Sequence, residues 1–276
     1  MKEDTKEYAA PAEVSRQDIA AGLRSIGITA KDKVMVHSSL KSFGRVEGGA
    51  RTVISALQEV ITPAGILAMP AFSDCSDGGA QGPFDPETSP VETWVGLIPE
   101  TFRHQPGVIR SLHPTHSVCA WGNDAARFLS QKDPWDIFSP DSPWGKLHEE
   151  GGKILFFGES VGGNTFLHAC EAWFNTYLDS TMAWIKTPDG PRQVRVTNYP
   201  GGCRGGWYKL KRQAPYYLKL DAMGVYHYGK IGDAVVTVCR ADELAAGMNK
   251  LFAEDPAILL HKEGCPGCAR LRSKIL

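Results

Sequence analysis

A histidine and a glutamate three residues apart form the pair in this sequence best suited to chemistry. His168 and Glu171 lie in the segment NTFLHACE, which is typical of the first turns of a helix. At that spacing both side chains fall on one helix face, with Cβ atoms about 5–6 Å apart. A carboxylate at that distance can fix the tautomer of an imidazole and keep it basic. The pair therefore predicts a general base, although such pairs also occur on helices without any chemical role.

A second pattern favours nucleophilic catalysis. The segment GESVG, with Ser160 at its centre, follows a predicted strand and precedes a predicted helix, which is the setting of a serine hydrolase nucleophile elbow. The glycines after the serine prolong the turn, however, so the helix is expected to begin near Thr165. The remaining triad members would have to be Asp221 with either His227 or His261.

Two further polar clusters lie at predicted strand ends. Residues 37–40 (HSSL) end the first strand, and their hydroxyls and backbone amides could hold phosphate oxygens. Residues 110–117 (RSLHPTHS) supply a cation, two imidazoles and hydroxyls before another strand. Both segments are also typical of structural turns. His113 and His116 could ligate a metal, but no third ligand stands at a suitable spacing.

The cysteines do not form a disulfide framework. There are seven, an odd and scattered set that fits a reducing compartment. Cys265 and Cys268 form a CxxC pair with His261 upstream, which could hold a metal or act as a redox pair. A closed zinc site needs four ligands and this neighbourhood offers three at most, so we expect a structural or incidental role and no metal.

Composition excludes several classes of protein. The chain has 276 residues, 42% of them hydrophobic, which is enough for one large core or two modest ones. Thirty basic and thirty-one acidic residues leave a net charge of −1, and no basic run interleaves with aromatic residues, so we expect no nucleic-acid partner. The N-terminus lacks the apolar stretch of a secretion signal, and no window approaches eighteen apolar residues. We therefore expect a cytoplasmic protein that does not bind membranes.

Helical and strand periodicities alternate along the chain. Ser15 should cap a first helix that ends at Gly27. A βαβ unit with parallel strands should follow, made by a strand at 34–37, a helix after Gly49 and a strand at 66–69. The carboxyl ends of its strands are the expected ligand site. Further strands are expected at residues 117–121, 153–157, 182–185, 193–197, 225–228 and 235–238, and further helices at residues 95–104, 124–129 and 242–252 and around His168.

A long acidic loop follows the second strand. Residues 71–90 are rich in Gly, Pro, Asp and Ser, and loops of such length are usually functional or disordered. No Lys or Arg occurs from residue 71 to residue 100, where the carboxylates are those of Asp74, Asp77, Asp85, Glu87, Glu92 and Glu100. Such a loop could bind a polycation, or it could be a solvated loop.

These segments occur together, in this order, in a known family. The chain resembles the aminoglycoside 3-N-acetyltransferases, which are unrelated in fold to the GNAT acetyltransferases. The matching stretches run from about residue 33 to residue 175 and read VMVHSSLKSFGRVEGGARTVISAL, GILAMPAF, WVGLIPETFR, PGVIRSLHPTHSV, SPWGKL, GGKILFFGE and NTFLHACE. In the second stretch, MPAFS stands where members often have MPTHT or MPTFT, which leaves the acceptor open.

The resemblance implies a fold and a reaction. The fold would be a layered α/β/α domain over residues 1–276 with a mixed, partly parallel central sheet, and extra short strands in a possible C-terminal subdomain at 180–276. The reaction would move an acetyl group from acetyl-coenzyme A to the 3-amino group of an aminoglycoside or a related polyamine and so confer antibiotic resistance, in a monomer or homodimer without a metal. A serine hydrolase and a non-catalytic binder are the alternatives.

The resemblance also assigns roles to residues. His168 would be the general base and Glu171 its partner. Because Cys170 should point away from both on a helix, we expect direct transfer without an acetylated cysteine. The coenzyme would lie along His37, Ser38, Ser39, Leu40, Arg110, Ser117 and Val118, and the acceptor would meet Asp74, Asp77, Glu92 and His116.

Overall fold

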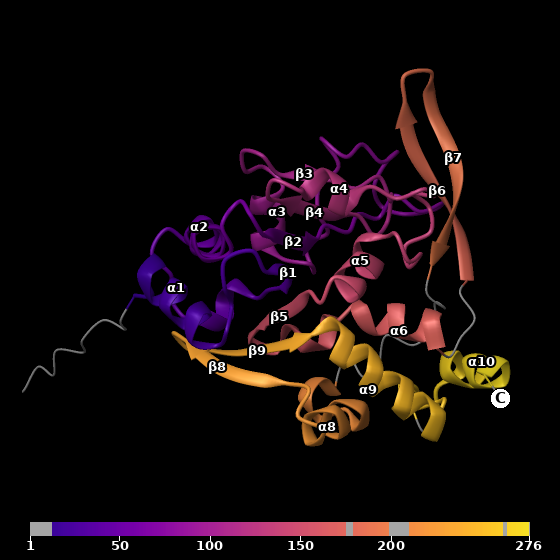
Figure 1. The fold of residues 1–276 in the computed structure, drawn as a ribbon. Coiled ribbons are helices and arrows are strands. Elements are labelled where there is room, and N and C mark those ends of the chain that lie inside the picture. Colours follow the sequence, from indigo (N-terminus) through magenta and orange to yellow (C-terminus); the bar gives the residue numbers. More distant parts are fainter. Residues whose placement is uncertain (1–12, 175–178, 199–209, 262–263, 276) are drawn as a thin grey trace, which may run out of the picture.

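The N-terminal βαβ unit forms as the sequence predicts. The computed structural model describes residues 13–174, 179–198, 210–261 and 264–275 (Figure 1). Helix α1 (Arg16–Ser25) begins with a capping box, in which the Ser15 side chain accepts from the backbone N–H of Asp18 and the Asp18 carboxylate accepts from that of Ser15. The unit continues through β1 (Lys33–His37), α2 (Ala50–Ile61) and β2 (Ile66–Pro70), and its two strands pair in parallel.

A mixed seven-stranded sheet forms the centre of the molecule. Its order is β3-β4-β2-β1-β5-β9-β8. The three central strands β2, β1 and β5 run parallel, whereas the strands outside them pair antiparallel. This confirms the mixed, partly parallel sheet. The additional strands are β3 (Ile109–Arg110), β4 (Val118–Trp121), β5 (Lys153–Phe157), β8 (His227–Ile231) and β9 (Ala234–Arg240).

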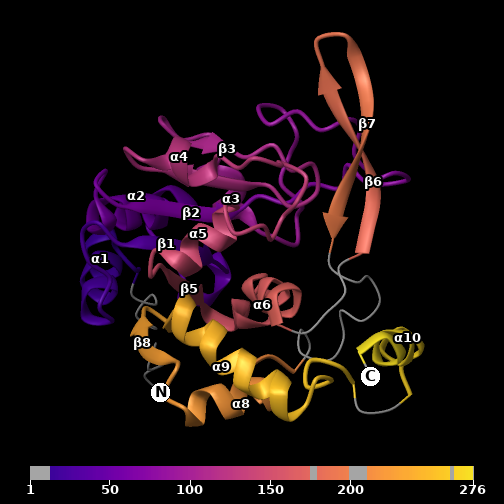
Figure 2. The same ribbon diagram turned by 45° about the vertical axis from the view of Figure 1, so that its right-hand side comes forward.

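Helices cover both faces of this sheet (Figures 1 and 2). Successive residues of a strand point to opposite faces, so Met35 joins one hydrophobic core while Val34 and Val36 join the other. Strands buried on both faces explain the nearly continuous apolar runs in the sequence. One layer contains α1, α2 and α3 (Leu97–Phe102), and the other contains α4 (Ala125–Leu129), α5 (Pro143–Glu149), α6 (Phe166–Phe174), α8 (Pro215–Ala222) and α9 (Ala241–Glu254).

A two-stranded hairpin stands apart from the main sheet (Figures 1 and 2). It consists of β6 (Asp179–Thr187) and β7 (Gly190–Asn198). The acidic loop folds against it, because Ser76 and Phe84 form bridges with Ala183 and Ile185. The loop and the hairpin share a small separate core, made by Cys75, Phe84, Ala183, Ile185, Val194 and Val196 with Trp135 packed against it. The long loop therefore has a defined conformation.

Several element boundaries differ from the sequence prediction. The helix expected from residue 95 begins at Leu97, because Gly96 has φ +112°. The strand expected at 225–228 begins at His227, because Val225 and Tyr226 enter the hydrophobic core instead. Some elements were not predicted from the sequence. They are the strand β3, the helices α5, α8 and α10 (Pro266–Ile275), and the short 3-10 helices η1 (Leu40–Phe43), η2 (Gly158–Gly163) and η3 (Lys211–Gln213).

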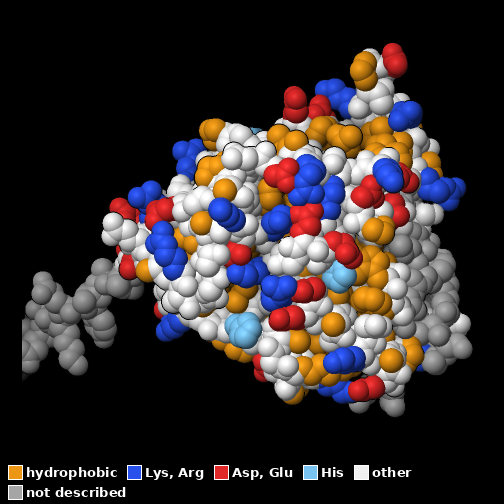
Figure 3. Space-filling view, viewed as in Figure 1, with side chains coloured by type: hydrophobic (Ala, Val, Ile, Leu, Met, Phe, Trp, Pro, Cys, Tyr) orange, Lys and Arg blue, Asp and Glu red, His pale blue; other side chains and the backbone are white. Residues whose placement is uncertain are grey.

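The C-terminal third contributes to the main sheet as well as to the hairpin. Residues 199–209 lie outside the described part of the chain. After them, β9 pairs with β5 in the main sheet. The surface mixes charges, with Lys and Arg interspersed among Asp and Glu over the face in Figure 3. Within the described part of the chain, no helix has the length and apolar character needed to cross a membrane.

Candidate active site

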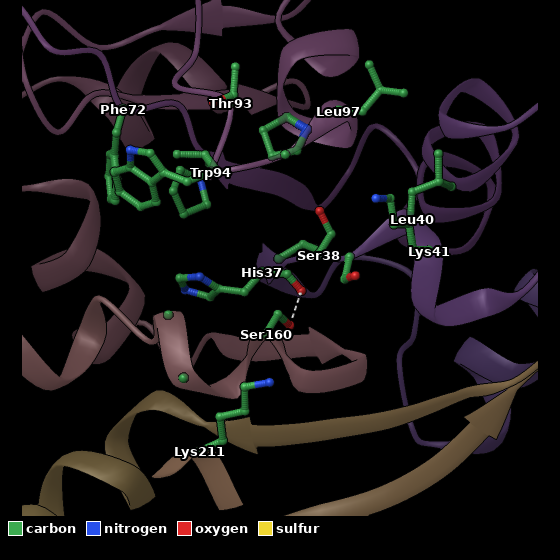
Figure 4. Close-up of a pocket in the computed structure, with 18 residues that line it drawn as sticks. His37, Ser38, Leu40, Lys41, Phe72, Thr93, Trp94, Leu97, Ser160 and Lys211 are labelled. Carbon is green, nitrogen blue, oxygen red and sulfur yellow. Dashed lines mark hydrogen bonds between the residues drawn. The ribbon is translucent and has the colours of Figure 1, made fainter. Parts of the chain in front are cut away.

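A cleft opens at the carboxyl ends of the parallel strands. It has a volume of about 630 Å³ and is lined by the ends of β1 and β2 and by the η2 turn that follows β5 (Figure 4). The neighbours of β1 are β2 on one side and β5 on the other, so the cleft lies where strand order reverses, the usual ligand site of open α/β sheets. The four residues of the HSSL segment, His37, Ser38, Ser39 and Leu40, all line it.

The wall of the cleft contains buried polar atoms without partners. Nε2 of His37 and Oγ of Ser38 make no hydrogen bond with any described residue. The centroid of the His37 ring lies 5.2 Å from that of Phe156 and 6.3 Å from that of Trp144, and both pairs are stacked. Burial lowers the pKa of His37 to about 3, so the imidazole is neutral at pH 7. Buried polar atoms nearly always have partners, and a bound ligand would supply them here.

The sequence analysis missed several residues that line this cleft. Trp94 and Leu97 are 53% and 59% exposed, and the Trp94 ring lies 5.8 Å from that of Phe72. Lys41 and Lys211 add two cations. In Figure 4 the two lysines approach from different elements, while Trp94 and Phe72 lie together on the opposite wall. The cleft thus combines an apolar wall, neutral polar atoms and positive charge, which suits a long ligand with apolar and anionic parts.

The predicted base and its partner are joined by a hydrogen bond. Nδ1 of His168 lies 2.6 Å from Oε2 of Glu171, and the two side chains are 19% and 13% exposed. The side chain of Asn164 accepts from the backbone N–H of Phe166, so α6 starts close to Thr165 as expected. With Nδ1–H donating to the carboxylate, the imidazole keeps the tautomer in which Nε2 carries the lone pair. This geometry is that of an oriented base.

The cysteine between the pair faces the other way. Cys170 is fully buried in the core, and burial raises the pKa of its thiol well above the ordinary value. Burial also raises the pKa of Cys75, to about 11. Both are therefore thiols at neutral pH, and a thiol is a poor nucleophile compared with its thiolate.

Comparison with known proteins identifies the family. A family model described as aminoglycoside 3-N-acetyltransferase matches residues 35–253. The chain belongs to the aminoglycoside 3-N-acetyltransferase family. Among its relatives, aminoglycoside N(3)-acetyltransferase IV from a Salmonella species is 30% identical over 260 residues, which are 94% of this chain and 95% of the relative.

Solved structures of aminoglycoside acetyltransferases share the fold. A variant of AAC(3)-IVa in complex with a gentamicin superposes with a TM-score of 0.81 at 28% identity, over 96% of this chain and 99% of that one. AAC-IIIb with CoASH superposes with a TM-score of 0.77 at 25% identity, over 88% of this chain and 97% of that one. The resemblance inferred from the sequence motifs is thereby confirmed, together with the fold class.

Arg110 is enclosed by protein in this acetyltransferase. Its guanidinium donates to Oγ of Ser117 at 2.9 Å, to Oγ of Ser73 at 2.7 Å and to the carbonyls of Ala71 and Ser89. Burial is the main cause that lowers its pKa, but an arginine stays charged. Arg110, Ser117 and Val118, which we predicted to contact the coenzyme, do not line the cleft. Arg110 instead ties both ends of the acidic loop to β3 and β4.

His116 lies behind the cleft wall. Its ring packs 4.7 Å from that of Phe72, and its Nδ1 lies 2.8 Å from Oγ1 of Thr115. The neighbouring His113 uses Nδ1 to accept the backbone N–H of His116 at 3.0 Å, and burial lowers the pKa of His113 to about 4. In the described chain no group of three possible metal ligands includes either histidine.

The carboxylates of the acidic loop also help to fold it. The two oxygens of Asp74 accept from the backbone N–H of Ala80 and the hydroxyl of Ser76, and Asp77 accepts from the indole N–H of Trp184 at 3.2 Å. Glu92 accepts from the side-chain amide of Gln81. Another loop carboxylate, that of Asp85, pairs with Lys186 of the hairpin at 2.9 Å, and this hydrogen bond is the main cause that lowers its pKa to about 2.

The geometry gives no support to a nucleophile elbow. The hydroxyl of Ser160 donates to the main-chain oxygen of His37 at 3.0 Å (Figure 4), and in the described residues no imidazole lies within hydrogen-bond distance of it. The Asp221 carboxylate accepts from the hydroxyl of Tyr228 at 2.6 Å. The segment forms a 3-10 helix in which Gly158 has φ +66°, and a Cβ there would lie 2.4 Å from Cβ of Ser42. Gly158 therefore serves close packing.

We expect Ser160→Ala to keep at least a tenth of the acetyltransferase activity, a loss of at most about 1.4 kcal/mol in transition-state stabilisation. The reason is that the substitution removes one hydrogen bond to a carbonyl and no nucleophile. Steady-state rates with acetyl-coenzyme A and an aminoglycoside measure it. Ser42→Ala is a matched control, because Ser42 makes a similar bond to the main-chain oxygen of Ser39 at 2.7 Å. A loss of several orders of magnitude at Ser160 alone would restore the nucleophile interpretation.

Proposed function

We propose that the protein transfers the acetyl group of acetyl-coenzyme A to the 3-amino group of an aminoglycoside and so confers resistance to that antibiotic. Membership of the family gives the reaction class. The observation that carries the mechanism is the 2.6 Å contact between His168 and Glu171, which orients an imidazole as a base.

The proposed reaction is a direct transfer. His168 takes a proton from the acceptor nitrogen, and the nitrogen lone pair then attacks the thioester carbonyl carbon. The C–N bond forms, the C–S bond breaks, and the leaving coenzyme thiolate takes the proton of the imidazolium, while the amide nitrogen releases its second proton to water. Glu171 stabilises the imidazolium that exists between these proton transfers. The protonated state of the buried thiols, Cys75 and Cys170, supports a path without an acetyl-cysteine intermediate.

We propose that the coenzyme occupies the cleft. The unpaired polar atoms of His37 and Ser38 would meet the pantetheine amides, and Trp94 would pack against apolar parts of the chain. Lys41 and Lys211 suit the phosphates. The related AAC-IIIb has been solved with CoASH, which supports a coenzyme site in this fold. For Arg110, Ser117 and Val118 we propose support of the loop in place of contact with the coenzyme.

We propose that the acidic loop and the hairpin hold the acceptor. An aminoglycoside is a polycation, and carboxylates orient such a ligand by charge-assisted hydrogen bonds. Asp74, Asp77 and Glu92 lie on a loop whose C-terminal end, at Thr93 and Trp94, lines the cleft. The related AAC(3)-IVa variant has been solved with a gentamicin, which supports an aminoglycoside as the acceptor class.

One assay tests the function against its alternatives. Purified protein is mixed with acetyl-coenzyme A and each member of an aminoglycoside panel, free thiol is followed with a chromogenic reagent, and the antibiotic is analysed by mass spectrometry. We expect thiol release that depends on the antibiotic and a product carrying one acetyl group. Ester hydrolysis without coenzyme would favour a hydrolase, and binding of the antibiotic without turnover would favour a non-catalytic binder.

We expect the double substitution of Asp74 and Asp77 by Asn to raise KM for the antibiotic several-fold while leaving KM for acetyl-coenzyme A unchanged. The reason is that Asn keeps the size of Asp and one acceptor oxygen but removes the charge that attracts the acceptor. KM for the antibiotic should also rise with ionic strength in the unmodified enzyme, because salt screens that attraction.

A matched control removes two carboxylates elsewhere. Glu254 and Asp255 are exposed at the end of α9, far from the hairpin in both ribbon views. Their replacement by Gln and Asn changes the net charge equally, so KM should stay as in the unmodified enzyme. If KM for the antibiotic changes neither with the loop substitutions nor with the salt concentration, the loop does not hold the acceptor.

A further inference from the structure

We propose that His261, Cys265 and Cys268 form a structural zinc site that fixes the C-terminal helix α10. The three residues lie within eight positions of each other in the sequence, and their ligand atoms all lie within 4.8 Å of one another. None of them lines the cleft, and none belongs to the His168–Glu171 pair. From the sequence no metal was expected here, because this neighbourhood offers three ligands at most and a closed zinc site needs four. The structure adds that the three ligand atoms converge.

The distances suit a tetrahedral zinc ion. Nδ1 of His261 lies 3.6 Å from Sγ of Cys268. With Zn–S bonds of about 2.3 Å and Zn–N bonds of about 2.0–2.1 Å, tetrahedral angles place a nitrogen and a sulfur ligand about 3.5 Å apart, and two sulfur ligands about 3.8 Å apart. A zinc ion therefore fits between the three atoms with small side-chain movements. The described residues supply three of its four ligands.

The backbone around the cysteines is shaped for metal thiolates. Gly264 has φ +75°, which lets the chain turn immediately before Cys265. Helix α10 then begins at Pro266, so both sulfurs lie at a helix N-terminus, where the dipole favours negative charge. The backbone N–H of His261 also donates to Sγ of Cys268 at 3.3 Å. Such a donor stabilises a sulfur that carries negative charge, as a zinc-bound thiolate does.

Few of the described side chains of helix α10 are buried. Among its described side chains only Cys268 and Leu271 are buried, and neither belongs to the large hydrophobic cores. A helix of ten residues is marginal in water without packing. Arg272 donates to the main-chain oxygen of His261, which links the helix to the same segment. A zinc ion bound by residues before and within the helix would stabilise it, because metal binding contributes directly to folding.

The alternative use of a CxxC pair is redox exchange. A redox pair needs one exposed, reactive cysteine, and here Cys268 is buried while Cys265 is only partly exposed. The imidazole that lies beside the sulfurs can be a third metal ligand, whereas a disulfide forms from the two sulfurs alone. A disulfide between the two cysteines would lower the mass of the denatured chain and its number of free thiols, whereas a zinc site would not, so the two uses can be told apart.

The first test measures metal in the whole chain, purified without a histidine tag. We expect about one zinc per chain after dialysis against metal-free buffer, since structural zinc binds tightly. Each ligand variant should retain less than a tenth of this zinc; the variants are Cys265→Ser, Cys268→Ser and His261→Gln. His227→Gln is the matched control, because His227 is an exposed histidine on β8 outside this cluster, and it should retain the full amount.

A second test needs no substitution and covers the case in which a variant fails to fold. A strong zinc chelator added to the unmodified protein should expose two further thiols to a chromogenic reagent and lower Tm, while kcat for acetyl transfer at low temperature stays within about twofold, because the site is remote from the cleft. Cobalt in place of zinc should give thiolate-to-metal absorption. A chain without zinc, thiols equally reactive before and after chelation, or a Cys265–Cys268 disulfide in the mass spectrum would each overturn the proposal.

Discussion

Replacement of His168 by alanine is expected to lower kcat for acetyl transfer by about 10²–10⁴-fold, with little change in KM for acetyl-coenzyme A. The acceptor is an ammonium at neutral pH and cannot attack a thioester until it loses a proton. Without the imidazole, the group proposed to take that proton is gone. Single-turnover and steady-state rates measure the loss, and near-normal turnover would show that another group is the base.

The partner of the base gives a finer measurement. Glu171→Gln should lower kcat by less than His168→Ala does, because the imidazole stays in place but loses the carboxylate that orients it. His104→Ala is the control for histidine loss, since His104 lies in the exposed turn after α3 and contacts Glu100 at 3.3 Å. An unchanged kcat in Glu171→Gln would assign that residue to structure alone.

Arg110→Ala is expected to lower the free energy of unfolding by about 3–5 kcal/mol, because it leaves several buried acceptors without a donor. These acceptors are Oγ of Ser73 and Ser117 and the carbonyls of Ala71 and Ser89. Urea unfolding measures the loss. At a temperature where the variant is still folded, KM for the antibiotic should rise, because the acidic loop loses its anchor.

A conservative variant separates this role from coenzyme binding. Arg110→Lys keeps the charge but replaces a planar group that reaches four acceptors by a single ammonium, so it should also be destabilised. If Arg110 contacted the coenzyme phosphates instead, Arg110→Lys would keep most of the stability and Arg110→Ala would mainly raise KM for acetyl-coenzyme A. That pattern would contradict the role assigned here and support the interpretation that the sequence first favoured.

The sequence predicted those parts of the fold that local patterns determine. The strand expected at 153–157 is β5 to the residue, because an apolar run there is bounded by glycines on both sides. The general base and its partner were predictable for the same reason, since both lie on one helix turn. Their roles remain predictions, but their contact is a feature of the structure.

What the sequence did not predict depends on contacts between distant segments. Lys41 and Lys211 meet in one cleft only because η1 and η3 come to the same end of the sheet. Arg110 precedes a strand, as ligand-binding residues often do, yet its neighbours in space are loop carbonyls that no local pattern reveals. The start of β8 was misplaced because burial of Val225 and Tyr226 in the core outweighs their tendency to form a strand.

Under the acceptor role proposed for the acidic loop, the hairpin β6–β7 lets acceptor choice vary separately from catalysis. It has its own small core and contacts the acidic loop through Ser76, Phe84 and Asp85, while the sheet that carries the cleft is complete without it. Mutations can therefore accumulate in this appendage, and through it move the loop carboxylates, at little risk to folding of the main body. An enzyme built this way can follow changes in antibiotic structure while its acetyl-transfer machinery stays under purifying selection.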